Sequence, residues 1–203
     1  MLKKHWGISL LSCASLLLTA CTVVDLDAEG KPIIPPDPDA KASYSNQTPQ
    51  QVVAQSWDSK VMASAHSQAL DWGGLLEKSR SLTPGKSLSV FVKASGEVTA
   101  VNRVSEREQN LAMTINGQPV SVQLGPVVRS NAIRDAAGFN FEEFTNQVQF
   151  AQLTKALNRQ AVKQLPPVDA SWQGKTVEAL MAVTVRQDGV QEAVALSLKP
   201  EAP

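Results

Sequence analysis

The sequence predicts an α+β fold in which five strands form an OB-like β-barrel, with one helix between strands three and four and another before strand one. Apolar residues follow a helical period near residue 50 and then alternate with polar residues in five later segments. A helical period returns between the third and fourth of these segments, which is the order of elements in an OB-type barrel. A small sheet packed on one helix gives the same local pattern and is the alternative architecture.

The first helix is predicted over residues 49–68. Thr48 supplies a capping hydroxyl and Pro49 suits the first helical position. Gln51 occupies the third helical position, where a capping box has a glutamine or a glutamate. The apolar positions that follow lie on one helical stripe, which makes Trp57 a core residue rather than a surface for stacking a ligand. The stripe consists of Val53, Trp57, Val61 and Ala65. Around the Gly73–Gly74 break, the apolar surface continues at Leu70, Trp72, Leu75 and Leu76.

Alternating apolar and polar residues predict five strands in the second half of the chain. The first is long and bends at Gly96, the second and third join at an Asn116–Gly117 turn, and Gly125–Pro126 ends the third. The last two flank a turn near Asp188–Gly189. The predicted strands cover residues 88–104, 111–115, 120–124, 177–185 and 194–198.

The second helix is predicted between the third and fourth strands. Asn140 is placed to cap it, Glu143 follows three positions later, and Pro166–Pro167 ends it. In this position the helix closes one end of the barrel. The folded part is therefore expected to be one domain over residues 48–203, with the barrel at 88–199.

The amino terminus has the pattern of a secretory signal with a lipoprotein cleavage box. Lys3 and Lys4 are basic, the run from Trp6 to Leu18 is apolar, and small residues precede Cys21. The run is too short and interrupted for a membrane-spanning helix of about 20 residues. We expect a signal peptide at 1–20; the alternative is an ordinary signal peptide that carries two cysteines.

Cys21 is the predicted lipid attachment site. Two acyl chains, usually joined by a third on the new amino terminus, hold a protein stably at a bilayer. Residues 21–47 are rich in proline and aspartate and are predicted to form a flexible tether, which in polyproline form would reach about 80 Å. Thr22, rather than aspartate, follows the cysteine and favours the outer membrane in an enteric-type sorting system. We expect the protein at the periplasmic face of the cell envelope.

The charge of the chain argues against nucleic acid as a partner. There are 19 basic and 19 acidic residues, and loss of Lys3 and Lys4 with the signal leaves a net charge of −2. Binding to phosphates needs a basic excess and a basic patch, and neither is visible. Apart from Cys21 the mature chain has no cysteine, so no disulfide or thiol nucleophile is available.

Residue patterns for catalysis or cofactor binding are few. His66 is the single mature histidine, and without cysteines it cannot complete a zinc or copper site. The sequence has no G-x-S-x-G elbow, no G-x-G-x-x-G and no phosphate loop. The adjacent Glu142 and Glu143 suit the first turn of a helix without any catalytic role. We therefore predict a non-enzymatic protein with no metal and no cofactor.

One polar segment is a candidate ligand site. Arg129, Arg134 and Asp135 follow the third strand in a loop, where a planar guanidinium could hold a carboxylate, a phosphate or a sugar hydroxyl. Asn146 and Gln147, in the helix that follows, add amide groups. The alternative is structural: Arg134 pairs with an acidic neighbour, while Asn146 and Gln147 bond to the loop backbone and fasten the helix to the barrel. A loop that enters this helix has many backbone groups to satisfy.

Three stretches of the chain resemble a known family when they are taken together: Trp57–Val61, Gly125–Arg129 with Ile133–Asp135, and Phe144–Val148 with Ala151. Together they resemble an uncharacterised family of predicted bacterial periplasmic lipoproteins, domain of unknown function 2291, over about residues 50–185. Members are often encoded beside ribose-type sugar import systems, so the resemblance implies a periplasmic accessory role. It carries over no catalytic residue, since the family has none assigned.

These observations predict a membrane-tethered accessory module that binds a small polar ligand and is linked to envelope transport. The alternative is a structural or assembly factor of the outer envelope, which would contact a protein partner through a contiguous apolar patch. An enzyme of carbohydrate or ester chemistry would need paired carboxylates in a cleft, and no sequence pattern indicates such a pair.

Overall fold

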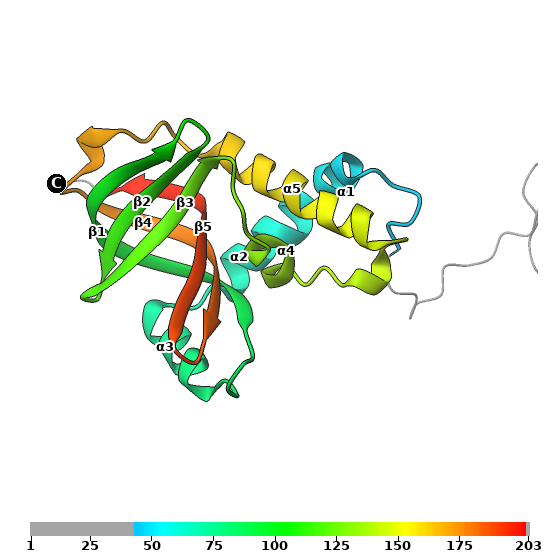
Figure 1. Cartoon of the computed structure of the whole chain (residues 1–203), viewed down its shortest axis with the longest axis horizontal. Helices are drawn as coiled ribbons and strands as arrows, with labels where there is room; N and C mark the ends of the chain where they lie inside the picture. The colour runs from blue at the N-terminus through cyan, green and yellow to red at the C-terminus, as the bar shows by residue number, and fades with distance from the viewer. Residues whose placement is uncertain (1–42, 202–203) are drawn as a thin grey trace, which may run out of the picture. The chain divides into compact units, whose positions relative to one another are not determined.

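Five strands are hydrogen-bonded to one another in a closed ring, with helices packed around it (Figure 1). The computed structural model describes residues 43–201. The ring order is β1-β2-β3-β5-β4; β3 and β5 run parallel and the other neighbours antiparallel, so the sheet is mixed. The strands are β1 (Leu88–Ser105), β2 (Glu108–Ile115), β3 (Gln118–Pro126), β4 (Thr176–Arg186) and β5 (Gly189–Pro200).

The structure does not test the predictions for the amino terminus. The predicted signal peptide, Cys21 and all but the last residues of the predicted tether lie outside the described residues. The α+β class is confirmed, and the five strands and the helix between β3 and β4 are in the expected order.

β1 turns a corner at Gly96 and contributes to two sides of the ring. Its first half pairs with β4 and its second half with β2, so Glu97 has a partner in each, Thr176 and Thr114. A Cβ atom at Gly96 would lie 2.7 Å from the Thr114 carbonyl oxygen. The predicted long strand is therefore present, and the glycine in it permits a close approach of two backbones.

Two turns join the strands as the sequence predicts. Between β2 and β3, Asn116 has a φ of 49° and Gly117 a φ of 78°, and positive values at both positions suit a two-residue hairpin turn. The β4–β5 turn ends at Gly189, where φ is 121°. A short 3-10 helix, η3 (Ala170–Trp172), precedes β4.

A continuous helical run covers the residues predicted as the first helix. It consists of α1 (Pro49–Ser56), the π-helix η1 (Trp57–Met62) and α2 (Ala63–Gln68). Thr48 caps α1, because its side chain accepts a hydrogen bond from the Gln51 backbone N–H and the Gln51 side chain accepts one from Thr48 N. The buried residues of the run include the whole predicted stripe: Val53, Trp57, Val61 and Ala65.

The structure has a further helix that the sequence pattern did not predict, α3 (Trp72–Ser81). Asp71 caps it by accepting a 2.7 Å hydrogen bond from the Gly74 backbone N–H. Trp72 and Leu75 are buried among the side chains that face the inside of the ring. Capping and burial together outweigh the helix-breaking tendency of the two adjacent glycines.

The helix predicted to begin at Asn140 is divided, so the predicted start is wrong. Asn140 caps only the 3-10 helix η2 (Phe141–Glu143), and the chain then extends before α5 (Gln147–Gln164) begins. Asn146 caps α5 by accepting a 2.9 Å hydrogen bond from the Gln149 backbone N–H. Two capping sequences follow one another here, and the second one precedes the long apolar stripe.

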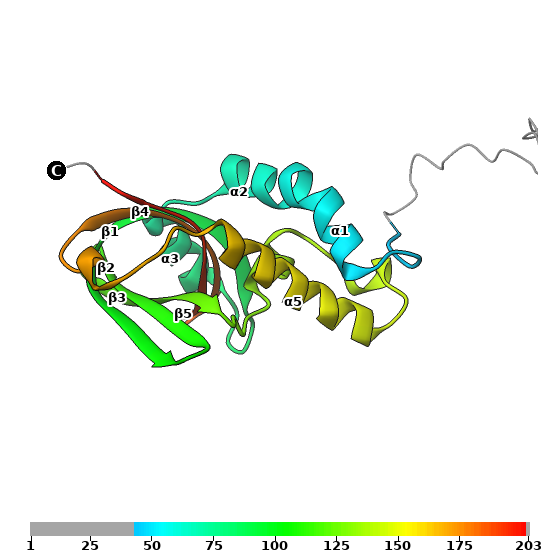
Figure 2. The ribbon, with the colours of Figure 1, turned by 90° about the horizontal axis from the view of Figure 1, so that it is seen from above.

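β4 is buried on both faces and separates two hydrophobic clusters. Leu180 and Ala182 pack on one side with residues of α1, α5 and the short helix α4 (Ala132–Ala136). Ala179 and Met181 pack on the other side with residues that face the inside of the ring. In Figure 2, α1 and α5 lie side by side next to the ring. The outer cluster thereby holds these two helices together and positions the groove between them.

The last residues of the predicted tether are held against the fold. Tyr44 N donates a 2.8 Å hydrogen bond to the Glu143 carbonyl oxygen, and Gln149 Nε2 donates to the carbonyl oxygens of Tyr44 and Gln47. The Tyr44 ring stacks on Phe144 with 5.2 Å between ring centroids. The flexible tether was expected to reach Gln47, but these contacts fix the chain from Tyr44 onward because they satisfy its backbone carbonyls.

We expect Tyr44→Phe to reduce the loss of stability at high pH. Burial, and then the Glu143 carboxylate, raise the pKa of the Tyr44 phenol. A raised folded-state pKa contributes stability that is fully present below the unfolded pKa of about 10 and is lost as pH rises through the folded pKa. Urea denaturation of both proteins at pH values from about 8 to 11 should show the wild type losing more stability than the variant. Parallel declines would contradict this role of Tyr44.

Candidate functional site

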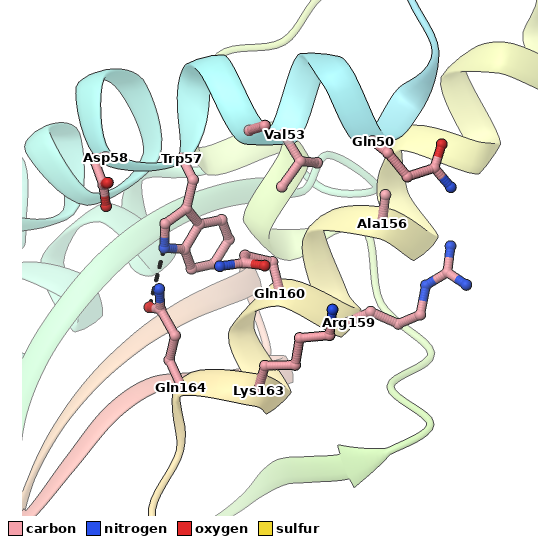
Figure 3. Close-up of a pocket in the computed structure, with 10 residues that line it drawn as sticks. Gln50, Val53, Trp57, Asp58, Ala156, Arg159, Gln160, Lys163 and Gln164 are labelled. Carbon is pink, nitrogen blue, oxygen red and sulfur yellow. Dashed lines mark hydrogen bonds between the residues drawn. The ribbon is translucent and has the colours of Figure 1, made fainter.

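A groove of about 500 Å³ lies between the α1–η1 run and α5 (Figure 3). Its volume falls within the range of pockets that bind small molecules. The two helices contribute about equally to the lining, with small and apolar side chains at its floor and polar ones at its rim. The lining residues are Gln50, Val53, Ala54, Trp57, Asp58, Ala156, Arg159, Gln160, Lys163 and Gln164.

Trp57 joins the two helices beneath the groove. Its side chain is 3% exposed and belongs to the outer hydrophobic cluster, which confirms the predicted core role. The indole Nε1 donates a 3.0 Å hydrogen bond to Gln164 Oε1 at the end of α5 (Figure 3). Because the ring is covered, it offers no open face on which a sugar or a base could stack.

The rim of the groove carries two cations on one face of α5. Arg159 and Lys163 are one helical turn apart and both are exposed. Within residues 43–201, neither side chain has a hydrogen-bond or ion-pair partner, while Asp58 contributes a single carboxylate from the other helix. Like charges four residues apart destabilise a helix slightly. The position of Lys163 in the last turn suits the helix dipole, but that reason does not extend to Arg159.

Arg129, the first residue of the ligand site predicted in the loop, does not line the groove. Arg129 extends into solvent, with 79% of its side chain exposed, and pairs with Glu108 of β2 at 3.1 Å. Its backbone N–H donates a 3.0 Å hydrogen bond to Gln123 Oε1. An exposed ion pair of this kind contributes little stability, so the guanidinium can exchange partners.

Arg134 and Asp135 pair with each other at the start of the helical region. Arg134 Nη2 and Nε each lie 2.7 Å from Asp135 Oδ1, and Nη1 donates a 3.0 Å hydrogen bond to Thr154 Oγ1 of α5. The guanidinium also lies 4.0 Å from the centre of the Phe150 ring. With 14% of its side chain exposed, Arg134 joins α4 to α5 through these contacts, and Asp135 is the acidic neighbour with which the structural alternative expected it to pair.

Asn146 and Gln147 lie at the amino-terminal end of α5 rather than one to two turns into it. Asn146 is the capping residue, so its Oδ1 is used by the Gln149 backbone N–H. Gln147 is the first residue of the helix and is exposed. Hydrogen bonds and ion pairs within the described part of the chain unite only Arg134 with Asp135 among the five predicted residues. Their ligand role stays a prediction.

A buried polar cluster under the loop was not singled out from the sequence. Ser130, 7% exposed, donates a 2.5 Å hydrogen bond from Oγ to Glu192 Oε2 and accepts one from the Ala132 backbone N–H. Asn158 Nδ2 donates to the carbonyl oxygens of Ser130 and Val128. These bonds fasten the loop to α5 and β5 and satisfy its backbone, which is a structural task. Asn158 could have been noticed as a polar residue on the apolar stripe of α5.

The described residues contain no group of three or more histidine, cysteine, aspartate or glutamate side chains that could hold a metal ion. His66 is exposed on α2 and lines a smaller cavity of about 230 Å³. Beside it, Lys93 and Glu178 form an ion pair at 2.9 Å. This cavity is below the usual size of a small-molecule site.

A family model described as a predicted periplasmic lipoprotein, DUF2291, matches residues 11–199. The chain belongs to this family. The match covers the three stretches that carry the resemblance, strands β1 to β4 and all but the last residue of β5, so the resemblance seen in the sequence is confirmed. No curated protein matches the chain.

Membership of the DUF2291 family places the protein in the periplasm, anchored to a membrane. Cys21, the predicted lipid attachment site, lies inside the matched range and outside the described residues. Between residues 43 and 201, no helix is long and apolar enough to cross a bilayer. The groove and the loop described above lie within the residues that the family model matches.

Proposed function

We propose that the protein is a non-enzymatic accessory lipoprotein that binds a small anionic molecule in the groove between α1 and α5. The observation that carries this proposal is the pair of cations, Arg159 and Lys163, on the rim of a groove of about 500 Å³, neither of which has a partner among the described residues. Acylated Cys21, after cleavage of a signal peptide at 1–20, holds this module at the membrane. Thr22 favours the outer membrane as the site of attachment.

The side chains of the groove suit a ligand that carries a carboxylate or a phosphate. The Arg159 guanidinium can bind either group in a bidentate manner, and the Lys163 ammonium adds a compact charge. Gln50 and Gln160 supply amide donors and acceptors for hydroxyl groups of the ligand. Since the Trp57 ring is covered, a neutral sugar would lack the aromatic face that commonly holds it. The link to sugar import is supported by the family resemblance alone.

We further propose that the strand ring is an OB-like barrel. The strand order β1-β2-β3-β5-β4 and the position of α5 between β3 and β4 support this. On such a module the candidate groove is formed by α5 and by the helices that precede the ring. The ligand site is therefore placed outside the barrel.

The alternative function, an assembly factor of the outer envelope, would need a contiguous apolar patch. In residues 43–201, the most exposed large apolar side chains form two separate pairs. One pair lies near the β1–β2 turn and the end of β3, and the other lies at the amino-terminal end of α5. They are Val104, Val127, Phe141 and Val148. This division favours the binding module over a large protein-docking face.

We expect the double variant Arg159→Gln, Lys163→Gln to weaken the binding of an anion by about tenfold or more. Each substitution removes a charge-assisted hydrogen bond to the anion. Mature protein would be tested by thermal shift and calorimetry with citrate, inorganic phosphate, glucose 6-phosphate and glucuronate, and with neutral ribose and glucose. The matched control is Lys155→Gln with Arg103→Gln, which removes two exposed cations outside the groove. A shift with an anion that only the groove variant loses supports the proposal. No shift with any anion, or equal loss in both variants, overturns it.

A further inference from the structure

Aromatic side chains are concentrated at the amino-terminal end of α5. The chain has five phenylalanines and one tyrosine, and four of the five and the tyrosine lie in this cluster. Ring centroids are 5.2 Å apart for Tyr44–Phe144 and Phe144–Phe150, and 5.8 Å apart for Phe141–Phe150. Phe139 completes the cluster at 5.9 Å from Tyr44.

Most of the cluster is covered, but its outer edge is not. Phe139 and Phe144 are buried, and cations lie against two of the rings: Lys60 Nζ is 4.0 Å from the centre of Phe139, and Arg134 is 4.0 Å from that of Phe150. Phe141, by contrast, is 46% exposed. Val148, in the first turn of α5, is 65% exposed. Single exposed apolar residues are common, so exposure alone does not identify a partner.

The tether joins the fold at the end that carries the aromatic cluster. The described residues begin at Ser43, and Tyr44 is already part of the aromatic cluster. A DUF2291 lipoprotein is anchored to a membrane, and the predicted anchor Cys21 precedes Ser43 by a stretch that spans at most about 80 Å when extended. The aromatic end is therefore the part of the fold joined directly to the tether, where the effective concentration of bilayer surface is highest.

We propose that this end of the domain rests on the bilayer, with Phe141 and Val148 in contact with lipid. Tryptophan and tyrosine are enriched at the membrane–water boundary, and phenylalanine is among the apolar residues that proteins bound to a membrane surface insert there. An acylated protein gains a second contact from such groups. The ring of strands then lies away from the bilayer, toward the carboxyl end of α5, a helix about 27 Å long. The proposal uses membrane anchoring and is independent of ligand binding in the groove.

The test places a single fluorescent label at three positions of the full lipidated protein, through Phe141→Cys, Val148→Cys or Val104→Cys. The protein is reconstituted in phosphatidylethanolamine–phosphatidylglycerol vesicles that contain lipids brominated on the acyl chains, and only protein that floats with the vesicles is measured. Val104 is the matched control, because it is 62% exposed and lies on β1 beside the β1–β2 turn. The neighbouring Gln109 donates a hydrogen bond to the Val168 carbonyl oxygen, beyond the carboxyl end of α5.

We expect the brominated lipid to quench the labels at 141 and 148 and to leave the label at 104 unchanged. Equal quenching at all three positions would mean that the domain has no fixed orientation, and would overturn the proposal. Labels at 141 and 148 that are blue-shifted but unquenched would place a protein partner or a second copy on this surface, which also overturns it. Unshifted, unquenched labels at both positions on vesicle-bound protein would show that this end stays in water.

Discussion

Replacing Trp57 with alanine is expected to lower the free energy of unfolding by about 3–5 kcal/mol, the range for truncation of a large buried aromatic side chain. The indole is 3% exposed and packs in the cluster that holds the α1–η1 run against α5. Truncation leaves a cavity under the groove and removes the 3.0 Å hydrogen bond to Gln164. Because both walls of the groove depend on this contact, the alanine variant should also lose ligand binding.

Two further variants separate packing from hydrogen bonding at Trp57. Trp57→Phe keeps most of the buried ring and loses the indole N–H, so we expect a cost well below that of the alanine variant. Gln164→Leu removes the acceptor alone and should cost about 1 kcal/mol. Urea denaturation followed by far-ultraviolet circular dichroism measures all three, since the chain has four tryptophans and their fluorescence changes with the substitution. Equal losses for the alanine and phenylalanine variants would contradict the packing role.

The core role of Trp57 was predictable because it depends on spacing along one element. Val53, Trp57 and Val61 recur at the helical period, and a helix with such a stripe must bury it. The same reasoning located the strands and the Asn116–Gly117 turn, where local residue types determine backbone conformation. Periodicity did not reveal α3, because its two glycines conceal a helix that Asp71 caps and tertiary packing stabilises.

The candidate site was harder to predict because it depends on pairings between distant segments. Arg134 has the same side chain whether it binds a ligand or a neighbour, and only the fold brings Thr154 and Phe150 to it. Arg159 and Lys163 look like ordinary solvated positions on the polar face of a helix. They become candidate ligand-binding residues only in the folded structure, where the α1–η1 run lies across the groove and neither cation has a partner among the described residues. The sequence of α5 alone shows neither feature.

Substituting valine for Gly96 is expected to lower the free energy of unfolding by about 3 kcal/mol, since added bulk in a filled site forces the backbone to move. At this corner of β1 a Cβ atom would lie 2.7 Å from both the Thr114 carbonyl oxygen and the Ile115 Cγ1 atom. The carbonyl belongs to the backbone of β2, so it cannot move aside by a rotamer change. The strain would act where β1 passes from β4 to β2 and would weaken the closure of the ring.

Alanine scanning of two glycines tests whether close approach, rather than backbone freedom, explains Gly96. In an unstrained strand, replacing glycine with alanine stabilises the folded protein, because alanine loses less backbone entropy on folding. Gly96→Ala should instead destabilise the folded protein, since even one methyl group collides with β2. Gly117→Ala is the control, with no atom within 4 Å of its Cβ position but a φ of +78°, so its cost of about 1 kcal/mol comes from conformation alone. Urea denaturation should therefore show the larger loss at Gly96. A gain of stability in Gly96→Ala would mean that β1 and β2 are farther apart at this corner than their backbone pairing indicates.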